Sequence, residues 1–336
     1  MKPIIYLQHS FWKELSSSDS LESLRTMLDI SDVLCDSHVI TDASEEDVQN
    51  DVFLMVFIKK GNYQRCNELY VEQTINNLNA PDNTENLCAT YLLSKDSSKC
   101  HSIEKDYGVV ALNAKTVSNR RYLFKGDGFS MDKRKRYLQR YLTFKEKLYH
   151  PCNSLIIIDP YLLIKREKDK DDNIIYPGIA NNLESLLDAI LPYNLKIDFH
   201  LTIISSLGKT EEVKRVYEKI KKSIRRIRRD LNVKLGLFYT GTGYYHEIES
   251  FHSRHILSNT YAVDSEDGLD LFNENGYLTK NNPVVSIVFP RLFGNSRQDL
   301  EKYCRWLSSV KKYVETDVSE RFYGSKENRL FELIKE

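Results

Sequence analysis

The sequence of 336 residues predicts an α/β protein with two domains, because apolar strands alternate with amphipathic helices and the charge is unevenly distributed. Residues 1–115 carry 10 Lys and Arg against 18 Asp and Glu, a net charge of −8, whereas residues 116–230 carry 25 against 15, a net charge of +10. We expect an acidic α/β domain over 1–115, a basic helical connector over 116–150, and a second α/β domain with C-terminal helices over 151–336.

The first domain is predicted from short apolar runs. Residues 4–7 and 89–96 read as buried strands, residues 97–107 as a helix closed by Gly108, and residues 109–112 as another strand. A strand, a helix and a strand in such close succession indicate a unit with parallel strands.

The connector is predicted to hold a basic helix over residues 131–149, with a stripe of aromatic residues on its packing side and Lys133, Arg134 and Arg136 among its exposed cations. In the second domain we expect helices at 181–190, 210–230 and across 296–336, and strands at 154–161, 196–204, 233–239, 250–257 and 284–289.

Helix 210–230 has an apolar seam opposite nine Lys and Arg residues, which either form a solvated face or bind a nucleic-acid backbone. On the second reading, the phosphate contacts come from these cations and from those of the connector: Arg225, Arg226, Arg228, Arg229, Lys133, Arg134 and Arg136.

His252 and Arg254 stand two residues apart on the strand predicted at 250–257, so their side chains share one face. A histidine beside a fixed cation suits phosphodiester chemistry, because charge develops on the phosphate oxygens as the bond breaks. The alternative is that both residues simply belong to the wetter face of a half-buried strand.

Residues 150–295 resemble the phospholipase D superfamily, and in particular its MIT C-terminal-like branch with a degenerate HKD motif. The likeness rests on His252-x-Arg254 followed by Asn259, on the string Gly-Leu-Asp-Leu-Phe at 268–272, and on strand 154–161. It implies His252 as the nucleophile, Arg254 as the phosphate ligand, Asn259 as the third motif residue, and no cofactor. One motif per chain further implies a homodimer, and the substitution of Asn for Asp favours binding over cleavage.

Residues 1–115 resemble a PIN-type nuclease domain in the strand at 89–96 and the Gly-Val turn before the last strand. The resemblance implies a metal site for Mg²⁺ or Mn²⁺ with Asp96 in the late acidic position. Gln8 or His9 occupies the place of the first carboxylate, and the middle position is open to several acidic residues: Asp42, Glu45, Glu46 or Asp47. The alternative is an acidic scaffold with solvated carboxylates.

These resemblances predict a component of a prokaryotic conflict or phage-defence system that binds nucleic acid, and leave open whether it is a nuclease. The alternative is a catalytically inactive module that recognises a phosphate group or a protein partner encoded nearby, and a third reading is binding to anionic phospholipid. The longest apolar run, residues 52–58, predicts no transmembrane segment, and the N-terminus has no secretory pattern, so we expect a cytoplasmic protein.

Overall fold

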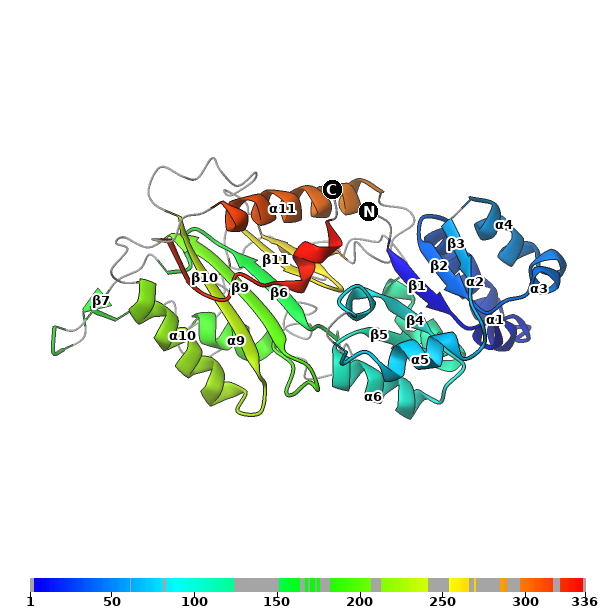
Figure 1. The fold of residues 1–336 in the computed structure, drawn as a ribbon, viewed down its shortest axis with the longest axis horizontal. Helices are drawn as coiled ribbons and strands as arrows, with labels where there is room; N and C mark the ends of the chain where they lie inside the picture. Colours follow the sequence, from blue (N-terminus) through cyan, green and yellow to red (C-terminus); the bar gives the residue numbers. More distant parts are fainter. Residues whose placement is uncertain are drawn as a thin grey trace. The chain divides into compact units, whose positions relative to one another are not determined.

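The protein is an α/β protein, as the sequence predicts, with two sheets of different build (Figure 1). A computed structural model describes residues 3–60, 62–80, 83–123, 151–163, 167–168, 170–172, 174–175, 182–206, 213–240, 254–265, 269, 285–288, 297–316 and 321–334. These residues gather in two compact units. The first unit holds a five-stranded sheet within residues 3–123, and the second holds a seven-stranded sheet within residues 151–334. In this described part of the chain, no helix has the length and apolar character needed to cross a membrane.

The sheet of the first unit is wholly parallel, and its strands follow the order β3-β2-β1-β4-β5. This is the order of doubly wound sheets, in which the direction of winding reverses beside the first strand. Ile5, Leu7 and Tyr91 are completely buried, as expected where helices cover both faces of a parallel sheet. The strands are β1 (Ile4–Leu7), β2 (His38–Thr41), β3 (Asn62–Arg65), β4 (Thr90–Leu92) and β5 (Val110–Leu112).

The helices of the first unit connect these strands. Asp96 caps the N-terminus of α6 by accepting a hydrogen bond from Lys99 N, and Gly108 ends the helix with a left-handed φ of 62°. The predicted helix over 97–107 and the parallel strand pair around it are therefore confirmed. The helices are α1 (His9–Ser16), α2 (Leu21–Cys35), α3 (Glu45–Asn50), α4 (Val52–Lys60), α5 (Tyr70–Asn76), α6 (Ser97–Tyr107) and α7 (Ala114–Val117).

The sheet of the second unit is mixed and has the order β13-β12-β11-β6-β9-β10-β14. Its centre, β6, β9 and β10, is parallel, whereas β11 and β14 run antiparallel to the strands beside them. Every residue of β6 and β9 is buried, which fits strands covered on both faces. The strands are β6 (Ser154–Ile158), β9 (Phe199–Ser206), β10 (Val233–Thr240), β11 (Arg254–Ser258), β12 (Ala262–Ser265), β13 (Val285–Val288) and β14 (Phe322–Gly324), with a separate hairpin of β7 (Glu167–Lys168) and β8 (Ile174–Ile175).

Helices lie on both faces of this second sheet (Figure 1). Tyr217 of α10 (Val213–Ile227) packs edge-on against Tyr323 with 4.7 Å between ring centroids, and α9 (Glu184–Ile190) lies beside α10. Tyr313 of α11 (Arg297–Glu315) packs at 6.4 Å against Phe238. Because Phe238 and Tyr323 are neighbours in register but not directly paired, they face opposite sides of the sheet. The sheet therefore separates α11 from α9 and α10.

The C-terminal residues differ from the prediction of continuous helix across 296–336. After α11 the chain forms β14, which pairs antiparallel with β10, and then a 3₁₀ helix at Arg329–Leu333. The aromatic rings of Phe322 and Phe238 meet at 4.7 Å, so the packing of paired strands outweighs local helix propensity.

His200 is the buried histidine of β9, 7 % exposed, and it lies near two cations. Arg329 donates from Nη1 to the carbonyl oxygens of Asn153 and Asp198, at 3.2 and 2.6 Å. Burial, assisted by the positive charges of Arg329 and Lys234, lowers the pKa of His200 to about 3. The imidazole is therefore neutral in the folded protein at neutral pH.

We expect His200 to make the protein less stable as the pH falls. The unfolded chain binds a proton at this residue below its ordinary pKa of about 6.5, whereas the folded protein does so only near pH 3, so stability is lost across that window and unchanged above it. The loss is on the order of a few kcal/mol. Urea denaturation of His200→Gln and of the parent between pH 7 and pH 4 measures it. Identical pH dependence of the two proteins would contradict the assignment.

Candidate functional site

The C-terminal edge of the second sheet gathers polar side chains from separate strands. The parallel strands β6, β9 and β10 end at this edge, and the antiparallel β11 begins there with Arg254. Ligands of α/β proteins bind outside the carboxyl ends of parallel strands. Ser206 and Thr240, the last residues of β9 and β10, share a buried hydrogen bond of 3.0 Å between their hydroxyl groups.

Arg254 stands over the ring of Tyr161, with 5.1 Å between the guanidinium carbon and the ring centroid. Tyr161 is 53 % exposed, so solvent reaches this ring, whereas Arg254 is half-buried beside it. A guanidinium stacked on an aromatic face keeps its N–H donors in a fixed plane, a geometry suited to phosphate oxygens.

Asp159 is a buried carboxylate that fixes backbone groups at the same edge of the sheet. It is 2 % exposed, and its carboxylate accepts hydrogen bonds from Tyr161 N at 2.8 Å and from Leu269 N at 2.9 Å. Burial raises the pKa of Asp159, while these hydrogen bonds and the charge of Arg254 oppose the rise. Asn182 donates to Leu269 O at 2.7 Å, so both backbone groups of Leu269 are held. Asp159 thus anchors Tyr161 and Leu269 at the edge where Arg254 lies.

The structure describes two of the three HKD-like residues, Arg254 and Asn259, and does not bring them together. His252 lies outside the described residues. Asn259 follows the far end of β11, roughly 17 Å from Arg254 at the usual rise per strand residue, and accepts a hydrogen bond from Asn153 N at 2.9 Å. Asn259 is buried and ties the end of β11 to the start of β6. Arg254 and Asn259 therefore do not meet at one site within a chain.

Other conspicuous side chains of β11 and the adjacent strands serve packing. The His255 ring stacks on Trp306 of α11 with 3.8 Å between centroids.

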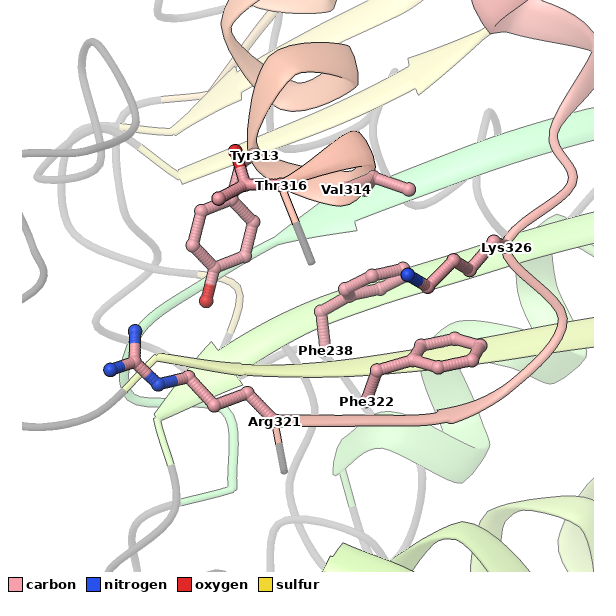
Figure 2. Close-up of a pocket in the computed structure, with 7 residues that line it drawn as sticks. All are labelled: Phe238, Tyr313, Val314, Thr316, Arg321, Phe322 and Lys326. Carbon is pink, nitrogen blue, oxygen red and sulfur yellow. The ribbon is translucent and has the colours of Figure 1, made fainter. Parts of the chain in front are cut away.

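Figure 2 shows a small pocket where β10, the end of α11 and the β14 segment meet. Lys326 lies 5.6 Å from the Phe322 ring centroid there, and the Tyr313 hydroxyl donates to Tyr239 O at 2.8 Å. The pocket is lined by Phe238, Tyr313, Val314, Thr316, Arg321, Phe322 and Lys326.

Helix α10 carries the predicted basic face. Its seam is buried on the sheet through Val213, Val216, Ile220 and Ile224. Between Val213 and Ile227 it carries seven Lys and Arg and one Glu, and the exposed cations include Lys214, Lys222 and Arg225. Arg229, just beyond the helix, is also exposed, whereas Lys133, Arg134 and Arg136 of the connector lie outside the described residues.

Arg228 is a correction to the predicted basic face. Helix α10 ends at Ile227 rather than at residue 230, so Arg228 turns inward and is 6 % exposed. Its guanidinium donates to Leu191 O at 3.1 Å, to the Asp188 carboxylate at 2.6 Å, and to Asp188 O. Arg226 is exposed but paired with Glu184. Of the four predicted arginines, Arg225 and Arg229 remain exposed with no ion pair among the described residues.

The arginine end of α10 and Arg254 lie at opposite edges of the sheet. Helix α10 connects the end of β9 to the start of β10, so it runs back along the strands and finishes at their N-terminal edge. A hydrogen bond of 2.8 Å from Phe199 N to Asn232 O marks that edge. The exposed cations of α10 and the half-buried Arg254 therefore belong to two separate places on the second unit.

Asp96 serves as a helix cap in the first unit. Its exposed carboxylate accepts from Lys99 N at 2.8 Å and from Ser98 Oγ at 2.6 Å, and the hydrogen bond from Ser98 is the main cause of its lowered pKa. Across the described ranges, no group of three or more His, Cys, Asp and Glu side chains is arranged to hold a metal ion.

Two of the acids predicted for the middle position of the PIN-like site, Asp42 and Asp47, are held by hydrogen bonds of their own. Asp42 accepts from His9 N at 2.6 Å, and Asp47 lies 3.2 Å from His9 Nδ1 while forming the capping box of α3 with Ser44. Hydrogen bonds from Ser44 lower the pKa of Asp47 to about 2. Gln8 occupies the end of β1 and accepts from Ser94 N at 2.9 Å. The polar side chains at the carboxyl ends of these strands are therefore engaged in hydrogen bonds with one another and with nearby backbone groups.

The sequence matches no protein-family model and no curated protein.

We expect Arg228→Ala to destabilise the second unit by about 2–3 kcal/mol, because it removes the charged donors of Leu191 O, Asp188 O and the Asp188 carboxylate. Arg229→Ala, the matched change at the next and exposed position, should stay within about 0.5 kcal/mol of the parent. Chemical denaturation of both variants measures the difference. Equal stability of the two variants would show that Arg228 is not a structural residue.

Proposed function

We propose that the second unit binds a nucleic-acid backbone through the exposed face of α10. The observation that carries this proposal is the row of exposed cations Lys214, Lys222, Arg225 and Arg229 along and just beyond a helix whose opposite face is fixed on the sheet. Its 15 helical residues extend roughly 22 Å, so the cations form a rigid line rather than a local cluster.

Electrostatic arguments favour a polyanion as the ligand. Glu218 is the only acidic residue of α10, so the helix attracts anions along its length. Contacts of this kind are made to phosphates and carry little sequence preference. A prokaryotic conflict or defence system remains the biological setting that the family resemblance suggests.

We expect the triple variant Lys222→Glu, Arg225→Glu, Arg229→Glu to lose most binding of a labelled oligonucleotide and to flatten its salt dependence. Each lost phosphate contact lowers the logarithmic salt slope by roughly 0.7–0.9. Fluorescence anisotropy at several salt concentrations gives both quantities. Arg226 and Arg228 are left unchanged because both form ion pairs with acids of the α9 segment.

The matched control reverses three exposed cations of the first unit, in Arg25→Glu, Lys105→Glu and Lys115→Glu. It changes the net charge equally but away from α10. The proposal fails if the parent protein binds no DNA or RNA in a salt-sensitive way, or if both triple variants bind alike.

A second candidate function is recognition or cleavage of a phosphodiester at the edge that holds Arg254. It is favoured by the half-buried Arg254 stacked on the exposed Tyr161 ring, beside the buried Asp159. Cleavage would use His252 as the nucleophile, with two chains contributing one histidine each. Without cleavage, the same groups form a recognition surface for a phosphate group or a protein partner.

For this second function we expect hydrolysis of bis(4-nitrophenyl) phosphate to persist in EDTA and to disappear in His252→Ala. A covalent histidine route needs no divalent ion, whereas a PIN-type route needs Mg²⁺ or Mn²⁺ near Asp96. Activity that is lost in EDTA and in Asp96→Ala would assign the chemistry to the first unit instead. Absence of hydrolysis under both conditions would leave binding alone.

A further inference from the structure

Tyr193 is an exposed aromatic ring beside the arginine end of α10. It follows α9 in the segment leading to β9, and its side chain is 77 % exposed, more than any other large hydrophobic side chain in the described ranges. A ring of this size left in water forgoes the stabilisation that burial would give, so its exposure is informative.

One face of this ring is held by Arg228. The guanidinium carbon lies 4.5 Å from the Tyr193 ring centroid, and the guanidinium is fixed in turn by Asp188 and Leu191. Because Arg228 is buried, it supports the ring from the protein side and leaves the other face toward solvent. The ring is thereby preorganised for stacking.

Two exposed cations lie close in the chain to the arginine that holds this ring. Arg229 is adjacent to Arg228 in the chain, and Arg225 lies one helical turn earlier. Single-stranded nucleic acids are bound by aromatic rings that stack on bases together with cations that contact the phosphates. In a duplex the bases already stack on one another, so a single exposed ring finds no free base face on which to stack.

We propose that Tyr193 stacks on an unpaired base, and that the nucleic acid bound at this end of α10 is single-stranded. This inference rests on the proposed function of α10. It assigns a residue and a substrate class that neither the charge pattern nor the resemblance to phospholipase D includes. A protein partner packing on the same ring would need no bases, and that difference provides the test.

The experiment measures binding of the full chain to a fluorescein-labelled oligothymidine, to an abasic oligonucleotide of equal length, and to a duplex. Tyr193→Ala should weaken oligothymidine binding about tenfold, while Tyr193→Phe, which keeps the ring, should remain within about twofold of the parent. Binding of the abasic oligonucleotide should be the same in all three proteins. Tyr70→Ala, at a half-exposed tyrosine of the first unit, is the control.

A Tyr193→Trp variant gives a direct readout, because a stacked base quenches indole fluorescence. We expect quenching by oligothymidine and none by the abasic strand. Salt-sensitive binding that is unchanged in Tyr193→Ala would overturn the stacking proposal and leave the proposed function intact. Equal loss of abasic and oligothymidine binding in Tyr193→Ala would also overturn it. The ring would then contribute to binding without contacting a base. Absence of any binding by the parent would overturn both.

Discussion

The second unit depends on the burial of its central parallel strands on both faces. Every side chain of β6 and β9 is withdrawn from water, which requires a helical layer on each side of the sheet. Parallel neighbours also require crossover connections, and α10 is the crossover from β9 to β10. The apolar seam that closes the core and the cations that face solvent are therefore two sides of the same helix.

Much of this architecture could be predicted, because it follows from the spacing of apolar residues and from helix-capping residues that are close together in the sequence. The spacing of Val216, Ile220 and Ile224 fixes the buried face of α10, and Gly108 after residues 97–107 fixes the end of α6. Periodicity and capping act over a few residues, so a single sequence reveals them. The α/β class follows from the same signals repeated along the chain.

The candidate sites were harder to predict because they depend on contacts between distant residues. No residue next to Arg228 in the sequence predicts that α10 ends at Ile227. Nor does any predict that the Arg228 guanidinium binds Asp188 and Leu191 O. Asn259 was assigned by its spacing from Arg254, whereas strand geometry places the two at opposite ends of β11. Tyr161 was predicted as the last residue of a strand over 154–161, whereas β6 ends at Ile158, and its position beside Arg254 came only from the fold.

Strand β14 has a consequence for solubility that concerns the rim of the sheet. It is three residues long, yet it covers part of β10, an eight-residue strand of largely apolar character. Gly324 makes this cover possible, since its φ of 101° and close approach to Leu235 O and the Tyr217 ring exclude a side chain. An uncovered strand of this kind offers its backbone N–H and C=O groups to other chains. By pairing with part of β10, the short strand β14 therefore limits the association of this sheet edge with strands of other chains.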